Sequence, residues 1–187
     1  MSAQYDDKLL KSCGKDVFIS PNAEIKRPHL VIVGSHIAID SFVVITTQLE
    51  IGNYVHIATH CTIIGGEKSK LIMKDFSGFA AGCRLVCGSD DYSGESLINP
   101  TIPEEYLLLH HSTITMERYS TLGTNVVVHP NITIGEGSVV GSCSLVTQDL
   151  DPWGIYVGIP AKRIRDRKKE NILKYSEILM NKLKLGE

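Results

Sequence analysis

The chain has 187 residues, of which 43% are hydrophobic and 21% charged, and its formal net charge is -2 at pH 7. This length suits one substantial domain, and the near balance of charge gives no field that would attract nucleic acid or a membrane surface. No apolar run approaches the ~20 residues of a membrane span, and the start of the sequence lacks a signal-peptide pattern. We therefore expect a cytoplasmic protein with no membrane span and no nucleic-acid partner.

The five cysteines are an odd number, which does not favour a framework of disulfides. We interpret Cys61, Cys83 and Cys143 as small buried residues of a repeat. Cys83 and Cys87 have no second pair with which to complete a zinc site. This usage fits a reducing compartment.

The first segment, residues 1–16, is predicted to be a capping helix. Tyr5, Leu9 and Leu10 alternate with Asp and Lys over residues 2–12, and Gly14 follows. A helix at this point would cover the first open strand edge of the domain that follows.

Residues 17–160 carry a repeat of six residues. Ile134 and Val140 are each followed four places later by a serine, Ser138 and Ser144. A period of six fits neither a helix nor an alternating strand, and it predicts a coil in which each short strand ends at a corner where Gly or Asn permits the turn. The inward positions are expected at Val33, Ile39, Ile45, Ile51, Ile57, Ile63, Met73, Phe79, Leu85, Met116, Leu122, Val128, Ile134, Val140 and Val146.

The repeat is interrupted twice. A small outward loop is expected at residues 65–69, and the period disappears between Gly88 and His111. Loops longer than about 12–15 residues are uncommon and are usually functional or disordered. Because the excursion over residues 89–112 contains Tyr92, Tyr106 and several aliphatic residues, we interpret it as a loop folded against a neighbouring subunit. The alternative is a solvated insertion.

The last segment, residues 161–187, is first basic and then helical. Ile172, Tyr175, Leu179 and Leu183 form one apolar stripe at helical spacing, which we expect to pack on the body of a trimer. The alternative is a freely solvated helix.

The repeats and the closing stretch from Val157 to Arg165 resemble the hexapeptide-repeat acyltransferases, and the likeness covers roughly residues 17 to 165. The resemblance implies an all-β fold, a left-handed parallel β-helix, with the short helix before it and the longer helix after it. It also implies a homotrimer with active sites between subunits. Its activity would be acetyl transfer from acetyl-CoA to a hydroxyl or an amine, with no metal.

The same resemblance assigns coenzyme-binding positions. By match to the galactoside and maltose acetyltransferases, Thr124, Ser142 and Thr147 occupy positions along the coenzyme arm, and Lys162 and Arg165 lie at its phosphate end. Cationic side chains suit phosphate. The alternative for Lys162 and Arg165 is that they are ordinary solvent-exposed basic residues without a ligand. Gln148 departs from the pattern of these relatives, which carry lysine at this position.

Acyl transfer needs a general base, and histidine is the usual one near neutral pH. The catalytic histidine of the galactoside relatives is absent, because Gly88 is followed by Ser-Asp-Asp. His56 and His60 lie in a stretch that resembles the surroundings of the catalytic histidine in lipid A and bacterial sugar acyltransferases. We expect both on the outer surface, stacked below Gly78 and Gly82, with His56 as the leading base. Either could instead be an ordinary surface histidine.

The stretch from Asp90 to Glu95 resembles a loop of acetyltransferases from surface-polysaccharide and lipopolysaccharide gene sets. The resemblance implies a sugar acceptor, either nucleotide-linked or part of a surface polysaccharide. Asp90, Tyr92 and Asn99 are the acceptor-binding candidates, since such side chains suit sugar hydroxyls. Asp91 is expected to orient the base or the acceptor, and to lie far from His56 of its own subunit.

Two other classes remain open at this stage. The same kind of coil carries γ-type carbonic anhydrases, for which His56, His60 and His129 would be the zinc ligands. A non-catalytic trimeric scaffold is the second alternative. The acyltransferase-like closing stretch and the long acidic excursion favour neither of them.

Overall fold

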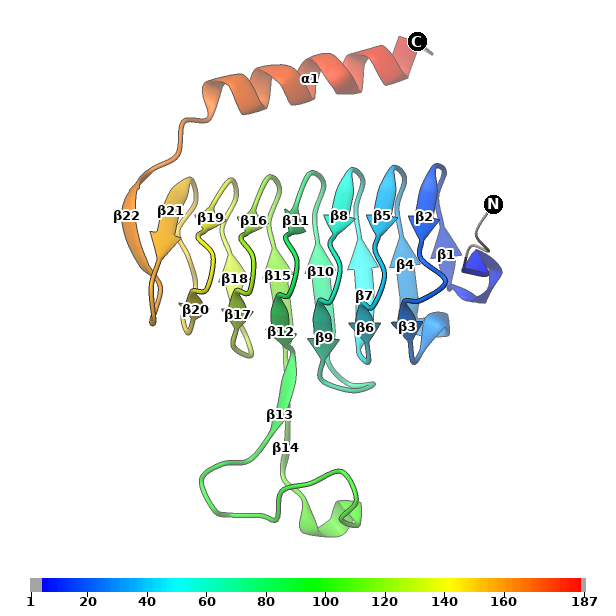
Figure 1. Ribbon diagram of the computed structural model, residues 1–187, viewed down its shortest axis with the longest axis vertical. Helices are drawn as coiled ribbons and strands as arrows, with labels where there is room; N and C mark the ends of the chain where they lie inside the picture. The colour runs from blue at the N-terminus through cyan, green and yellow to red at the C-terminus, as the bar shows by residue number, and fades with distance from the viewer. Residues whose placement is uncertain (1–4, 186–187) are drawn as a thin grey trace.

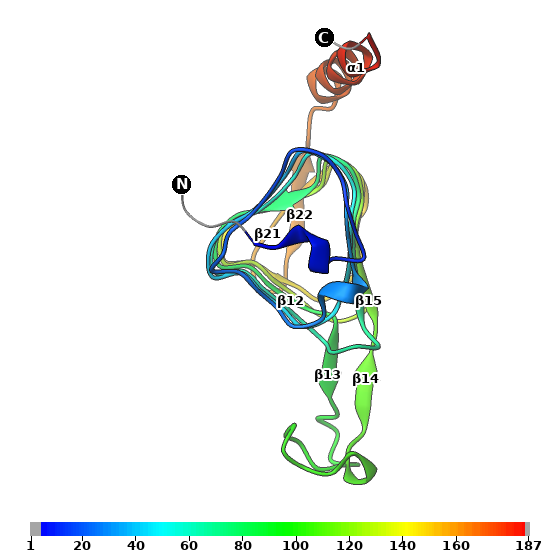
Figure 2. The ribbon, with the colours of Figure 1, turned by 90° about the vertical axis from the view of Figure 1, so that its right-hand side faces the viewer.

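The computed structural model describes residues 5–185 of the chain, with side-chain exposure for residues 5–182. The chain winds as a triangular coil, and each full turn contributes one strand to each of three parallel sheets, which we call A, B and C (Figure 1). Seen along its axis the coil is a triangle, with one segment leaving it at the corner between sheets C and A and a helix lying beyond the corner between A and B (Figure 2).

The strands are short. Sheet A contains β1 (Ser12–Cys13), β4 (Val31–Val33), β7 (Gln48–Ile51), β10 (Lys70–Met73), β15 (Thr113–Met116) and β18 (Thr133–Ile134). Sheet B contains β2 (Val17–Ile19), β5 (Ile37–Ile39), β8 (Val55–Ile57), β11 (Gly78–Phe79), β16 (Thr121–Leu122), β19 (Val139–Val140), β21 (Gly154–Val157) and β22 (Lys162–Asp166). Sheet C contains β3 (Glu24–Ile25), β6 (Val44–Ile45), β9 (Thr62–Ile64), β12 (Arg84–Val86), β17 (Val127–Val128) and β20 (Leu145–Val146).

The core is a stack of the inward positions of the repeat. Ile57 pairs in register with Ile39 below it and with Phe79 above it, so identical places of successive turns lie on top of one another. Every inward residue predicted from the period is buried, and so are the small residues four places later, including Ser138 and Ser144. The all-β coil predicted from the sequence is therefore confirmed.

The corners differ in detail from the prediction. Positive φ does not fall on the glycine that follows the aliphatic residue: after Ile134 it falls on Gly137, with φ 68°, and not on Gly135. A Cβ on Gly135 would instead overlap the carbonyl oxygen of Leu150 in the next turn, so this glycine is required by the close stacking of turns.

Aromatic residues hold the left-handed corner position between sheets A and B. Tyr54, Phe76 and Tyr119 have φ between 58° and 62°. Tyr54 stacks on Phe76 with ring centroids 5.0 Å apart, and Phe76 stacks on Tyr119 at 5.3 Å. These contacts offset the strain of a left-handed bulky residue, which the sequence period alone does not show.

The helix predicted over residues 2–12 is reduced, from Tyr5 onward, to a 3-10 helix at Asp7–Leu9. The Asp6 side chain accepts a hydrogen bond from the Lys8 backbone N–H and caps this single turn. Ser12–Cys13 then pairs with β4 as an edge strand, because sheet A offers unpaired backbone groups at that position. A second 3-10 helix, Pro28–Leu30, lies between β3 and β4.

The predicted excursion begins and ends as an antiparallel ribbon. β13 (Gly88–Asp90) pairs with β14 (Leu109–His111), and Ser89 lies opposite His110. The ribbon projects away from the C–A corner (Figures 1 and 2), and between its strands lies a third 3-10 helix, Glu104–Tyr106. Large apolar side chains remain exposed there: Tyr92, Leu97, Ile98, Tyr106, Leu108 and Leu109.

The basic segment is a strand and not the start of a helix. β22 pairs antiparallel with β21, so that it covers the edge of β21 and is the last strand of sheet B. Helix α1 (Glu170–Leu185) follows. Tyr119 and Ser176 hydroxyls are 2.8 Å apart, which joins the helix to the aromatic corner.

Part of the predicted apolar stripe faces that corner. Ile172, Tyr175 and Leu179 line a cleft with Phe76 and Tyr119, although Tyr175 and Leu179 stay exposed. The side chain of Leu183 lies outside the described side chains. No helix in residues 5–185 is both long enough and apolar enough to cross a membrane.

The cysteines follow the prediction except at one position. Cys61 and Cys83 are buried, and burial also raises the pKa of the Cys87 thiol to about 12. The prediction that Cys143 is buried is wrong: it is exposed, with φ 59°, because it occupies the corner position that precedes the inward Ser144.

Candidate functional site

His56 lies in the middle of sheet B with its imidazole on the outer face. Its side chain is 58% exposed, and its Nε2 lies 2.9 Å from Oδ2 of Asp40, which follows the preceding strand of the same sheet. On either side in the row are small residues, Ala38 and Gly78, in register with it. The predicted stacking on Gly78 is confirmed, and neither in-register neighbour has a side chain larger than a methyl group.

This pairing sets the chemistry available to His56. An ionised carboxylate can only accept a hydrogen bond, so the proton of a neutral His56 imidazole belongs on Nε2. The lone pair on Nδ1 is then free to take a proton from an acceptor. The Asp40 carboxylate would stabilise the imidazolium that forms, so the pair has the geometry of an oriented general base.

His60 is placed less favourably. It occupies the corner between sheets B and C with φ 59°, and its ring stacks on Phe42 at a centroid distance of 4.9 Å. Within the described residues its ring makes no hydrogen bond, so no group there orients a proton on it. The predicted neighbour Gly82 does lie one turn above, where its N–H donates to the Thr59 carbonyl.

The outward row that contains His56 runs to the end of the coil. From β8 the register passes through Gly78, Thr121, Val139 and Ile155 to Arg165 of β22. Sheet B has five strand-to-strand steps between β8 and β22. At ~4.8 Å each, they separate His56 from Arg165 by roughly 24 Å. An extended coenzyme arm with its diphosphate can span such a distance, so the face can hold a base at one end and a phosphate partner at the other.

Two of the three coenzyme-arm candidates lie together. Thr124 and Ser142 are stacked at the B–C corner in successive turns, where the Cys143 N–H donates to the Thr124 carbonyl. Lys162 starts β22 opposite Val157, at the same end of sheet B. Thr147 lies apart from them, after β20 at the C–A corner, as does Gln148. Thr124, Ser142, Thr147, Lys162 and Arg165 are all exposed.

Asp91 organises the excursion. Its carboxylate accepts hydrogen bonds from the Ser93 hydroxyl at 2.8 and 2.9 Å, and from the backbone N–H groups of Ser93 and Glu95. These bonds, led by that of the Ser93 hydroxyl, lower the pKa of Asp91 to about 2. Its histidine neighbour is His110, with Nε2 at 3.5 Å, and not His56.

The other acceptor-binding candidates differ in whether their side chains are already hydrogen-bonded within the protein. Asn99 uses its Oδ1 to hold the backbone N–H and hydroxyl of Thr101, both at 2.9 Å, so it is committed to a turn. Tyr92 is 77% exposed on the excursion. Asp90 lies in the ribbon, and its carboxylate forms no ion pair or hydrogen bond within the described residues.

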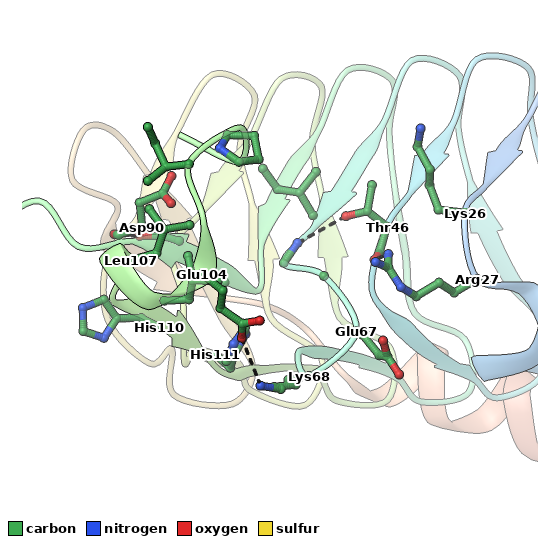
Figure 3. A pocket seen from close by; sticks show the side chains of 18 residues that line it. Lys26, Arg27, Thr46, Glu67, Lys68, Asp90, Glu104, Leu107, His110 and His111 are labelled. Carbon is green, nitrogen blue, oxygen red and sulfur yellow. Dashed lines mark hydrogen bonds and ion pairs between the residues drawn. The ribbon is translucent and has the colours of Figure 1, made fainter. Parts of the chain in front are cut away.

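A cavity of about 970 Å³ lies between the ribbon and the C–A corner of the earlier turns. Figure 3 shows Lys26, Arg27 and Thr46 on one side, Asp90, Leu107 and His110 of the ribbon on the other, and Glu67 and Lys68 from the small loop between them. The His111 Nδ1 lies 3.3 Å from the Ser69 hydroxyl beside it.

The two candidate regions cannot meet within one chain. In a triangular coil, the side opposite the C–A corner is sheet B, so the ribbon points away from His56 of its own chain (Figure 2). This agrees with the expectation that Asp91 and His56 lie at different places. Asp40, Arg27 and His110 were not foreseen, because their positions depend on pairing between turns and on the ribbon register.

The metal alternative finds no support in the geometry. His56 is paired with Asp40, His60 lies at the B–C corner and His129 follows β17 near the C–A corner. Within residues 5–185, no three His, Cys, Asp or Glu side chains are close enough to hold a metal ion.

Comparisons with known proteins agree with the acyltransferase resemblance. The family model described as bacterial transferase hexapeptide (six repeats) matches residues 113–148. The dTDP-4-amino-4,6-dideoxy-D-glucose acyltransferase of Escherichia coli is 31% identical over 170 residues, covering 89% of this chain and 88% of that protein. The galactoside O-acetyltransferase of Escherichia coli is 40% identical, but over only 53 residues, or 28% of this chain and 26% of that protein.

A solved structure is similar over nearly the whole chain. The N-acyltransferase AntD from Bacillus cereus, in complex with dTDP and 3-hydroxybutyryl-CoA, superposes with a TM-score of 0.89 at 33% identity, covering 97% of this chain and 98% of that chain. The coil, its interrupted repeat and these full-length similarities lead to one assignment. The chain belongs to the hexapeptide-repeat acyltransferases, enzymes built on a left-handed parallel β-helix.

Proposed function

We propose that this protein transfers an acyl group from an acyl-CoA to the amine of a dTDP-linked 4-amino-4,6-dideoxy sugar. One observation carries the choice of acceptor. The dTDP-amino-sugar acyltransferase of Escherichia coli is similar over 89% of this chain, and AntD, solved with dTDP, over 97% of it. The galactoside O-acetyltransferase is similar over only 28%. Amide formation is therefore favoured over ester formation.

In the proposed reaction, His56 acts on the acceptor. Its Nδ1 takes a proton from the sugar ammonium, while Asp40 holds Nε2–H and stabilises the resulting imidazolium. The freed amine attacks the thioester carbonyl, and the attacking nitrogen releases its second proton to solvent. The new C–N bond replaces the C–S bond, and the imidazolium gives the first proton to the leaving thiolate, so that an amide, coenzyme A thiol and one proton are formed. The thioester is supplied by acyl-CoA, which Thr124, Ser142, Lys162 and Arg165 would hold along sheet B and the B–C corner.

The active site would be composite. The ribbon points away from sheet B of its own chain, so the excursion of one subunit would approach His56 of a neighbouring subunit. A homotrimer with closed threefold symmetry gives every subunit such a neighbour. The exposed apolar side chains of the excursion, such as Leu97 and Ile98, would then be covered by the neighbouring subunit.

Location and pathway follow from the same proposal. Acyl-CoA thioesters and sugar nucleotides are made in the cytoplasm, so we infer that the enzyme acts there. An N-acylated dideoxy sugar on a nucleotide carrier is a donor suited to assembly of a surface polysaccharide such as lipopolysaccharide.

The direct test is a coupled assay of thiol release. Purified protein would be incubated with dTDP-4-amino-4,6-dideoxyglucose and either acetyl-CoA or 3-hydroxybutyryl-CoA. A nucleotide-linked amide product should form, whereas the corresponding 4-hydroxy sugar nucleotide should give none. Turnover of the hydroxy sugar alone would overturn the choice of amine acceptor.

The base is tested by His56→Ala, with His60→Ala as the matched variant. Loss of a positioned base should lower kcat by ~100-fold or more, with coenzyme affinity unchanged, whereas His60→Ala should have a much smaller effect. Full activity of His56→Ala would exclude His56 as the base.

The composite arrangement is tested by complementation. Inactive His56→Ala and Asp91→Ala proteins, dissociated and reassembled together, should recover part of the activity through sites made from two intact halves. Absence of recovery in trimers shown by mass to be mixed would contradict a site shared between subunits.

A further inference from the structure

The cavity at the C–A corner has two oppositely charged ends. Lys26 and Arg27 come from the corner before β4, and Asp90 comes from the ribbon on the far side of the same cavity (Figure 3). Because these segments are far apart in the chain, the arrangement exists only in the folded coil.

Arg27 is the cation that is free to bind an anion. Its guanidinium donates one hydrogen bond to the Thr46 carbonyl, at 2.8 Å, which holds the side chain in place. It forms no ion pair with any described carboxylate, unlike Lys26, which pairs with Glu24 at 2.7 Å, and Lys68, which reaches Glu104 at 3.9 Å. The planar fork of an oriented arginine matches the oxygens of a phosphate.

The remaining charges on the cavity are Glu67, Glu104 and Asp90, together with the imidazoles of His110 and His111. Glu104 is engaged by Lys68, and Glu67 is exposed on the small loop. Neither Glu67 nor Asp90 forms an ion pair within the described residues, and Asp90 is the carboxylate that the ribbon places across the cavity from Arg27 (Figure 3).

The cavity also has an apolar part to its lining. Pro100, Ile102, Leu107 and Leu109 of the excursion line it, with Ile64 from the coil. Ile102 and Leu107 are half-buried, so they present a surface against which a flat base or a deoxy sugar could pack.

We propose that this cavity binds the acceptor as a sugar nucleotide, with its diphosphate on Arg27 and its sugar ammonium directed toward Asp90. This rests on the proposed function, since it is the nucleotide-linked amino sugar that carries both a dianionic diphosphate and a cation. The cavity has a cationic side and an anionic side, as the diphosphate and the ammonium of such a molecule require. Coenzyme A shares the nucleoside diphosphate chemistry but has no ammonium for Asp90.

The experiment measures binding by calorimetry for dTDP, the dTDP-4-amino sugar and coenzyme A. Arg27→Gln should weaken dTDP and the amino sugar nucleotide by about tenfold or more and leave coenzyme A unchanged. Asp90→Asn should weaken only the amino sugar nucleotide. Arg27→Lys keeps the charge without the fork and should fall between wild type and Arg27→Gln.

The matched control is Lys15→Gln, which removes an exposed positive charge at the A–B corner and should change no affinity. Circular dichroism and thermal melting would confirm that each variant is folded. Added salt should weaken dTDP binding to wild type more than to Arg27→Gln, since the charge pair is screened.

The outcomes separate this inference from the proposed function. Equal dTDP affinity in wild type and Arg27→Gln, or no dTDP binding by wild type, would overturn the inference, while turnover of the amino sugar would still support the proposed function. Loss of coenzyme A binding in Arg27→Gln with dTDP retained would overturn it too, because the cavity would then belong to the donor. Selective loss of dTDP without amino-sugar turnover would support the nucleotide site and reject the proposed reaction.

Discussion

The coil and the excursion are stabilised in different ways. In the coil, Leu85 is fully buried and pairs in register with Ile63 and Val128, and this environment is repeated in each turn. In the excursion, the largely buried Asp91 carboxylate binds Ser93 and Glu95 while Tyr92 and Leu97 are exposed. The coil is therefore held by a continuous apolar core, whereas the excursion combines local polar order with an exposed apolar surface.

The largest expected difference between the regions is in stability. Leu85→Ala removes a buried side chain from the middle of the stack and should lower the free energy of unfolding by about 2–5 kcal/mol. Tyr92→Ala, in the excursion, should change it by no more than about 0.5 kcal/mol. Urea denaturation measures both.

The same pair of variants also separates scaffold from acceptor binding. If Tyr92 contacts the acceptor, Tyr92→Ala should raise KM for the sugar nucleotide without a change in the unfolding midpoint. A large loss of stability in Tyr92→Ala would show that the excursion is part of the folding core.

An effect of intermediate size is expected at the coenzyme face. Lys162→Ala with Arg165→Ala removes two cations from β22, so acyl-CoA affinity should fall about tenfold and depend less on salt concentration. Binding of dTDP should be unchanged, because the cavity proposed for the nucleotide lies on the ribbon side. Coenzyme affinity that keeps its wild-type value and salt dependence would reject these two residues as phosphate partners.

The smallest effect is a pH dependence confined to the excursion. The pKa of Asp91 lies at about 2, below the ordinary value of 3.8, so its carboxylate stabilises the folded loop at higher pH. This contribution is complete above about pH 4 and is lost as the pH falls through about 2. Backbone amide shifts of Ser93 and Glu95 should follow that titration, while those of Ile57 and Leu85 stay constant.

The Asp91→Asn protein is the control for this titration, because it lacks the ionisable group and its Ser93 and Glu95 amides should not respond. A midpoint near 3.8 in the wild-type protein would mean that the hydrogen bonds of Asp91 do not form in solution.

The sequence by itself determined the coil, its core and the extent of its interruption. Ile57, Leu85 and Val140 could be placed inside because a six-residue period is local and each turn buries the same position. The outward position of His56 followed from the same period, as did the separation of the excursion from His56.

Only the tertiary structure decided which side chains act together. The Asp40–His56 pair joins neighbouring strands of sheet B, and the cavity brings Arg27 to the far side of a space bounded by Asp90. Burial repeats with the period of the chain, but side-chain pairing depends on the orientation of each side chain and on the antiparallel register of the ribbon. A periodic pattern carries no information about either, because the exposed positions that hold these residues are not constrained by the core.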